Sequence, residues 1–142
     1  MTTANQAWES LLSAHAVLTK RFAVQDSWGE LSMREYDVLY TLSKCAGPAR
    51  ISDLNRHVLL SQPALSRLVH RLAGDGLVEC RPDPADGRSV LVSLTSAGRQ
   101  RQRDIGRRHA RSVAGALTAV LDHGELAQLE SICRKLADQE DQ

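Results

Sequence analysis

The sequence has 142 residues, of which 42% are hydrophobic, so a single domain of this length can bury a substantial core. No run of apolar residues exceeds three, far short of the roughly 18 that a transmembrane helix needs, and the first residues lack the pattern of a secretion signal. The net charge is only +1. We therefore expect a cytoplasmic protein with no membrane partner.

The small net charge conceals a basic centre. Residues 50–108 contain 11 arginines against 6 acidic residues, whereas the rest of the chain contains 7 basic and 11 acidic residues. A centre rich in arginine suits phosphate recognition, because a planar guanidinium pairs bidentately with phosphate or guanine. The alternative is a solvated surface with uneven charge. Aromatic residues make up only 4% of the chain, which argues against a protein that stacks single-stranded bases.

The first predicted element is an amphipathic helix over residues 7–23. Its apolar face recurs at helical spacing and comprises Trp8, Leu11, Leu12, His15, Leu18 and Phe22. A second helix should begin after Ser32, because Glu35 three residues later completes a capping box. We expect this helix to run to about Lys44 and to end before the Gly47-Pro48 pair.

Residues 51–94 are predicted to form two short helices and a strand pair. The first helix has an inner face of Ile51, Leu54 and Val58. The second begins at Ser61 as N-cap, with Pro63 in its opening turn, and ends at Gly74 and Gly76. Its inward residues are Leu65, Leu68, Val69 and Leu72, and its outward residues are Gln62, Ser66, Arg67 and His70, with Arg71 on the flank. "LVECR" and "SVLVSL" alternate as paired strands around the loop "RPDPADGR".

The C-terminal third is predicted to form two helices. Thr95 can cap a long helix that runs to Leu121, whose first half has only Ile105 to bury and so should cross between two packed regions. Its second half turns apolar at Val113, Leu117, Val120 and Leu121. After a break at His123-Gly124, a final amphipathic helix carries Leu126, Leu129, Ile132, Cys133 and Leu136. The three cysteines are widely spaced, so we expect each to be a small buried apolar residue and neither a disulfide nor a metal ligand.

This order of elements is that of a winged helix-turn-helix. The major groove of B-DNA admits one α-helix, which needs an apolar inner face and polar outer side chains, and the helix after Ser61 has both. Arg67 can donate twice to guanine, Gln62 can pair with adenine, and Ser66 or His70 can reach a base edge or a phosphate. An ordinary amphipathic surface helix is the alternative reading. The predicted fold class is mainly α (α+β).

The stretch "LSQPALSRLVHRLAGDGLVECRPDPADGRSVLVSLTSAG" resembles the MarR (multiple antibiotic resistance regulator) family. The similarity is strongest over residues 51–98, through the serine-led helix, the "GLV" exit and the "D.R...V.LT..G" wing, and the helix order extends it to the whole chain. The resemblance implies a transcriptional regulator that binds double-stranded DNA. It places Asp86 and Arg88 at the wing, with Arg88 in the minor groove and Asp86 holding that arginine or shaping the turn. The implied DNA contacts are Ser61, Gln62, Pro63, Ser66, Arg67, His70, Arg71, Arg81, Asp86 and Arg88.

The resemblance also implies a homodimer on a pseudo-palindromic operator. The broad apolar stripes of the terminal helices agree with this, since a second chain would cover them. The expected dimer residues are Trp8, Leu11, Leu12, Leu117, Leu121, Leu126, Leu129, Ile132 and Leu136. The corresponding division is an N-terminal dimerisation helix (1–30), a winged DNA-binding region (31–98), and a linking helix with a C-terminal dimerisation helix (99–142), intertwined as one domain.

Members of this family generally bind a small aromatic or anionic effector, which implies a ligand pocket here. The candidates are His15, Phe22, Trp28, Met33, Tyr36, Tyr40 and His109. For Trp8, Phe22 and Met33, which lie at helical positions, the alternative is a role in the core. A sensor that responds to oxidation of Cys45 or Cys80, or to a metal, is another alternative. We expect no cofactor and no metal. An enzyme would need a nucleophile with a base, or a glycine-rich phosphate loop, and neither pattern is present. A winged helix that binds only protein is a third possibility, against which the arginine-rich centre argues.

Overall fold

The structure is a computed structural model that describes residues 1–25, 28–55 and 58–139. In chain order, its elements are α1 (Ala4–Ala23), α2 (Met33–Lys44), β1 (Ala49–Arg50), α3 (Ile51–Leu54), α4 (Gln62–Gly74), β2 (Val78–Asp83), β3 (Asp86–Leu94), α5 (Ser96–Thr118) and α6 (His123–Ala137). Contacts divide the chain into two units, residues 1–109 and 110–142. Helix α5 therefore contributes to both units.

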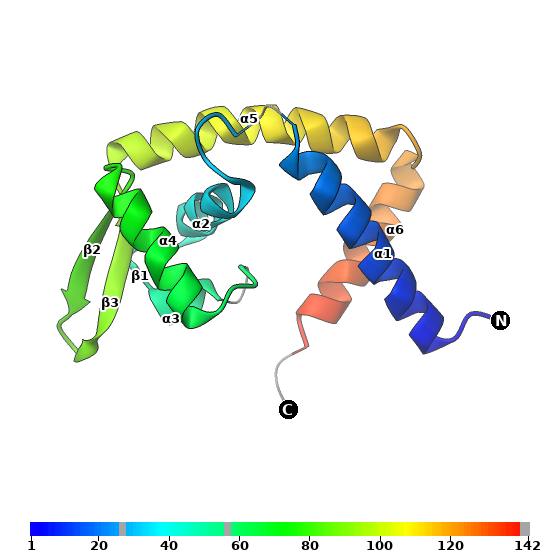
Figure 1. Cartoon of the computed structure of the whole chain (residues 1–142). Helices are drawn as coiled ribbons and strands as arrows, with labels where there is room; N and C mark the ends of the chain where they lie inside the picture. Colours follow the sequence, from blue (N-terminus) through cyan, green and yellow to red (C-terminus); the bar gives the residue numbers. More distant parts are fainter. Residues whose placement is uncertain (26–27, 56–57, 140–142) are drawn as a thin grey trace. The chain divides into compact units, whose positions relative to one another are not determined.

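The core of the first unit lies between α2, α3, α4 and the strands. Helix α2 packs against β3 and α4, α3 packs against β1, β3 and α4, and α4 packs against β2 (Figure 1). The side chains with essentially no exposure are Leu39, Leu54, Leu65, Leu72, Ile105, Val38, Val58, Val69 and Val92. The prediction that Ile105 is the buried residue of the arginine-rich part of α5 is confirmed. The arrangement is the predicted winged helix-turn-helix.

Local side-chain hydrogen bonds fix where the helices begin. The Ser32 hydroxyl accepts from the Glu35 amide at 3.1 Å, and the Glu35 carboxylate accepts from the Ser32 amide at 3.1 Å, so the predicted capping box is confirmed. Helix α4 begins after Ser61, whose hydroxyl accepts from the Ala64 amide. Helix α1 starts at Ala4, three residues earlier than predicted, because Thr3 and Gln6 form a further capping box.

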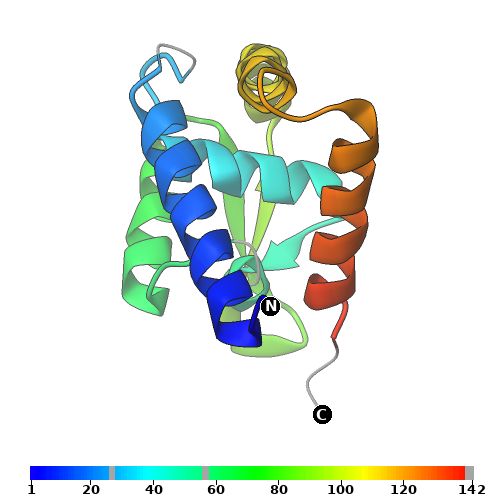
Figure 2. The same ribbon diagram turned by 90° about the vertical axis from the view of Figure 1, so that its right-hand side faces the viewer.

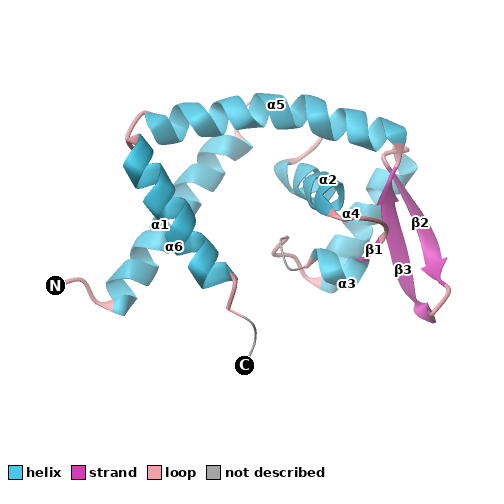
Figure 3. Ribbon diagram, turned by 180° about the vertical axis from the view of Figure 1, so that it is seen from behind, coloured by secondary structure: helices cyan, strands magenta, loops and turns pink. Residues whose placement is uncertain are grey.

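The three strands form one antiparallel sheet in the order β1-β3-β2 (Figure 3). Val78 pairs with Leu94, and Val92 pairs with both Cys80 and Ala49. Gly76, with φ of +75°, makes the left-handed turn between α4 and β2 that a residue with a side chain rarely adopts. The strands extend further than predicted: most of the expected loop belongs to them, and only Pro84 and Ala85 connect them. A register shift at Pro82/Asp83 accompanies this extension.

The second unit contains the end of α5 and α6, which follow each other through the loop at residues 119–122 (Figure 2). The prediction that the long helix reaches Leu121 and that His123-Gly124 breaks the chain is wrong. Helix α5 ends at Thr118, and α6 begins at His123 because Asp122 and Glu125 form a capping box. Leu129, Ile132 and Leu136 of α6 are 40%, 58% and 54% exposed.

The cysteines are more exposed than the sequence predicted. Cys45 and Cys80 are exposed and Cys133 is half-buried, so the expectation of three buried thiols is wrong. Cys45 caps α2, where its thiol donates to the Thr41 carbonyl, and Cys80 is exposed on β2. The alternative core role of Trp8 does not hold within one chain, since its side chain is 56% exposed, and its place in a dimer interface stays a prediction. Within the described residues, no helix has the length and apolar character to span a membrane.

Candidate nucleic-acid interface

The outer face of α4 presents most of the residues predicted to contact DNA. Leu65, Leu68, Val69 and Leu72 are buried, which turns the opposite side of the helix to solvent. Ser61, Gln62, Pro63, Arg67, His70 and Arg71 are exposed, and Ser66 is half-buried. A polar face on a helix with a fixed apolar underside is the geometry that major-groove recognition requires.

Two of these side chains already have hydrogen-bond partners on the protein. The Gln62 amide oxygen accepts from Asn55 Nδ2 at 2.9 Å, which leaves its amino group to donate outward. Bidentate pairing with adenine uses both groups, and the amide oxygen has a second lone pair with which to accept from the base while Asn55 stays bound. The His70 Nδ1 atom lies 2.7 Å from the Ser66 carbonyl. When Nδ1 donates to that carbonyl, Nε2 is the atom available to DNA.

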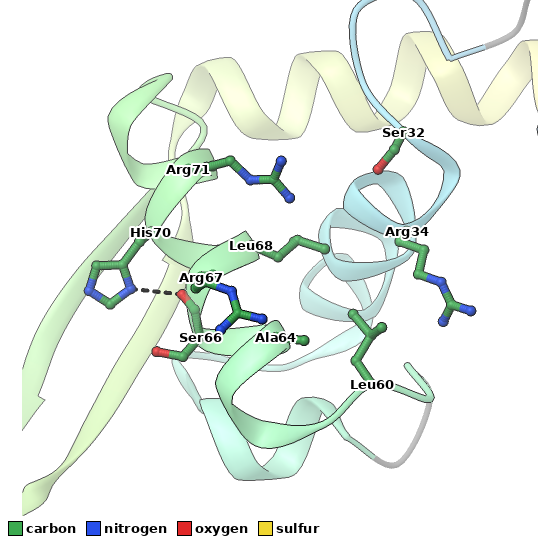
Figure 4. Close-up of a pocket in the computed structure, with 9 residues that line it drawn as sticks. All are labelled: Ser32, Arg34, Leu60, Ala64, Ser66, Arg67, Leu68, His70 and Arg71. Carbon is green, nitrogen blue, oxygen red and sulfur yellow. Dashed lines mark hydrogen bonds between the residues drawn. The ribbon is translucent and has the colours of Figure 1, made fainter.

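A groove borders α4 on the side of α2 (Figure 4). It has a volume of about 860 Å³ and is lined by Ser32, Arg34, Leu60, Ala64, Ser66, Arg67, Leu68, His70 and Arg71. Arg34, from the first turn of α2, was absent from the residues predicted from sequence. Its guanidinium donates to the Leu59 carbonyl at 3.2 Å. Nothing in the spacing around Arg34 relates it to α4, since the two meet only through the fold.

At the tip of the hairpin, Asp86 shapes the turn. Its carboxylate accepts from the Arg88 amide and from the Ser89 hydroxyl, both at 3.1 Å. Asp86 was predicted either to hold the Arg88 side chain or to shape the turn. Its hydrogen bond to the Arg88 backbone amide corresponds to the second of these roles. The Arg88 side chain is exposed next to the tip, and Arg81 is exposed on β2. The hairpin can therefore present Arg88 to a groove of DNA.

The loop end of β2 is held by an ion pair that the sequence did not reveal. Arg50 Nε and Nη2 donate to Asp83 Oδ2 at 3.0 and 2.9 Å, and the Ala85 amide donates to Asp83 Oδ1 at 2.9 Å. Asp83 is 7% exposed and is the buried charged residue of the described chain. The Ala85 amide and the Arg50 guanidinium hold the pKa of Asp83 below its usual range. Arg50 on β1 thus reaches past the central β3 to fix the end of β2.

Five of the seven predicted effector residues form an aromatic cluster in the first unit. The His109 ring lies 4.7 Å from Trp28, 5.3 Å from Phe22 and 5.7 Å from Tyr36, measured between centroids. Tyr36 is also 6.1 Å from Tyr40, on the next turn of α2. His15 is exposed on α1 and Met33 is half-buried, and neither has a ring contact with this cluster in the described structure.

Burial controls the protonation of this cluster. Burial lowers the pKa of His109, which favours the neutral ring, and raises the pKa of Tyr36, which keeps its hydroxyl protonated. A side-chain hydrogen bond links Tyr36 to Gln102. Among the described residues, His109 Nδ1 has no hydrogen-bond partner although it is buried. A neutral imidazole with an unused nitrogen can donate to or accept from a small polar ligand.

Residues 1–25, 28–55 and 58–139 contain no group of three or more histidine, cysteine or acidic side chains placed to hold a metal ion.

The predicted dimer residues are accessible within a single chain. On α1, Trp8, Leu11 and Leu12 are 56%, 37% and 48% exposed, and in the second unit Leu117, Leu121 and Leu126 are half-buried.

The chain is similar in sequence to proteins of one known family. The profile of the MarR family matches residues 31–90. The chain is 30% identical over 107 residues to the multiple antibiotic resistance protein MarR of Salmonella typhimurium, which covers 75% of this chain and 74% of that protein. It is 32% identical over 71 residues to the transcriptional repressor IacR of Pseudomonas putida, covering 50% of this chain but only 42% of the repressor.

Among solved structures, the transcriptional regulator PcaV of Streptomyces coelicolor, in complex with its natural ligand, is similar with a TM-score of 0.70 and 28% identity. The similarity covers 99% of this chain and 95% of PcaV. The relatives are transcriptional regulators and not enzymes, which confirms the non-enzymatic prediction. Sequence and fold together place the chain in the MarR family.

Proposed function

We propose that this protein is a dimeric, sequence-specific DNA-binding regulator of transcription. The observation that carries the proposal is the outer face of α4, where Arg67 and His70 stand exposed above a buried apolar underside. The hairpin beside it carries Arg88 at its exposed tip. A helix for the major groove and an arginine for the minor groove together read one half-site. Two copies would read a pseudo-palindromic operator in the cytoplasm, where the DNA is.

We further propose that the regulator is a repressor released by a small aromatic or anionic ligand. The relative IacR is a repressor, and PcaV was solved with its natural ligand. In this chain, Phe22, Trp28, Tyr36 and His109 bring buried aromatic rings together with a phenol and an imidazole. Such a combination of aromatic walls and a few polar groups is typical of small-molecule sites.

A fluorescence-anisotropy titration tests the DNA-binding proposal. The probe is a duplex from the promoter region next to the gene, with a scrambled duplex of equal length as control, and the titration is repeated across salt concentrations. Phosphate contacts predict that log K falls linearly with log salt, and base contacts predict tighter binding to the promoter. Equal affinity for both duplexes at every salt concentration would exclude a sequence-specific regulator.

A further inference from the structure

The groove between α2 and α4 gathers three arginines from two separate helices. Figure 4 shows Arg67 and Arg71 on the side formed by α4, and Ser32 and Arg34 on the side formed by α2. Leu60, Ala64 and Leu68 complete the lining. Such a groove offers guanidinium groups along an apolar surface.

The charges of these arginines are not neutralised by neighbouring carboxylates. Among the described residues, no acidic side chain lies within 4 Å of Arg34, Arg67 or Arg71. Asp37, one turn after Arg34, feels the Arg34 charge only at longer range. Three cations that share one groove without close counter-charges favour binding of an anion.

A hydrogen bond to the backbone holds the Arg34 side chain beside this groove. Its donor bond to the Leu59 carbonyl fixes one guanidinium nitrogen and leaves the other nitrogens to donate elsewhere. The residue lies in the first turn of the 12-residue helix α2, where the helix dipole adds partial positive charge. Arg34 lies on α2, beside α4 and away from the outer face of α4. When α4 occupies the major groove of DNA, Arg34 is therefore next to the edge of that groove, which is lined by phosphates.

We propose that Arg34 binds one backbone phosphate of the DNA at the border of the major groove that α4 reads. This inference rests on the proposed function and adds a contact from α2 to it. Arg34 anchors the recognition helix without reading sequence, whereas Arg67, nearer the outer face of α4, remains available to a base. The occupant of the groove is therefore a phosphodiester of duplex DNA.

The test compares Arg34→Ala with Arg103→Ala, an exposed arginine of α5 outside the groove, in anisotropy titrations on promoter and scrambled duplexes. We expect Arg34→Ala to weaken binding to both duplexes by the same factor, roughly five- to tenfold near 0.1 M salt, and to lower the salt slope by about 0.9. Arg34→Lys should restore most of the slope, because the charge is kept. Wild-type affinity and slope in Arg34→Ala would overturn the inference, as would a loss confined to the promoter duplex.

A second measurement keeps the proposal testable even if Arg34→Ala is less stable. Methylphosphonate substitution removes the charge of one phosphate at a time along the promoter duplex. Wild-type protein should lose affinity at one position in each half-site where Arg34→Ala loses nothing further. If every position affects both proteins equally, Arg34 contacts no phosphate. Wild-type protein that binds no duplex at all would instead refute the proposed function, which separates the two failures.

Discussion

Arg67 is the side chain of α4 best suited to base recognition. It is exposed, it projects from a helix whose opposite face is buried, and its guanidinium can donate twice to one guanine. Sequence periodicity predicted this placement, because inward and outward residues of a helix are fixed by its period. Periodicity did not predict that Gln62 accepts from Asn55 or that Asp83 pairs with Arg50. Those contacts join residues that only the tertiary fold brings together.

Arg67→Ala tests base readout directly. We expect it to cost about 1–3 kcal/mol on the promoter duplex and little on a scrambled duplex, so that specificity is relaxed. Arg88→Ala serves as the matched control, because a minor-groove contact should weaken binding most when the flanks are A·T-rich. Competition titrations with both duplexes measure the ratio. An unchanged promoter-to-scrambled ratio in Arg67→Ala would remove Arg67 from base readout.

Asp83 should make the stability of the hairpin depend on pH. Because its folded pKa lies below the unfolded value of about 3.9, its contribution is complete above that value and is lost as pH falls through the folded pKa. Asp83→Asn should therefore be less stable than wild type at pH 7, and the difference should shrink below pH 4. Thermal unfolding at several pH values measures this.

The exposed Asp75→Asn is the control for the Asp83 substitution. Asp75 forms no ion pair in the described part of the chain, so its substitution should leave the melting temperature close to that of wild type. A constant difference between Asp83→Asn and wild type from pH 7 to pH 3 would show that the Arg50 pair does not stabilise the fold through the ionised carboxylate.

At the scale of elements, the sequence predicted which segments are helices and strands better than it predicted the residues at which they begin and end. The Ser32-Glu35 box and the Ser61 cap were visible as motifs, so the starts of α2 and α4 were correct. The break before α6 was misplaced because glycine at position 124 suggested a stop, although Asp122 is the residue that caps. The hairpin was predicted too short, because prolines normally interrupt strands and Pro82 lies at a register shift that accommodates it.

Gly98 shows how tightly α5 is joined to the winged unit. A Cβ atom at this position would lie 1.9 Å from the Leu77 carbonyl oxygen, closer than any non-bonded contact allows. Gly98→Ala should therefore destabilise the fold by roughly 1–3 kcal/mol or more, because the start of α5 must shift. Chemical denaturation measures the change in the free energy of unfolding.

The matched control for this prediction is Gly115→Ala in the same helix. Nothing lies within 4 Å of a Cβ built at Gly115, so alanine should stabilise by about 0.4–1 kcal/mol through its helix propensity. Opposite signs for the two substitutions are the expected result. A neutral Gly98→Ala would mean that the contact between α5 and the Leu77 backbone is looser than described.

At the scale of the whole molecule, the terminal helices carry apolar side chains that one chain leaves exposed. Leu129, Ile132 and Leu136 recur at helical spacing on α6 and are all at least 40% exposed. Their amphipathic pattern was visible in the sequence, and the expectation that a second chain covers them came from the family resemblance. We expect Ile132→Asp to shift the protein from dimer to monomer in sedimentation velocity, while Gln128→Asp on the same helix leaves the dimer intact. Equal sedimentation of Ile132→Asp and wild type would exclude α6 from the interface.

The central claim is that two copies of this chain read two half-sites of one operator through α4 and the wing. Hydroxyl-radical footprinting of wild-type protein on the promoter duplex tests it most directly. The account predicts two symmetric protected patches about 10–10.5 base pairs apart, or a multiple of that spacing, with weaker protection beside each patch at the wing. A single unpaired patch, or uniform protection that moves with the ends of the duplex, would contradict it.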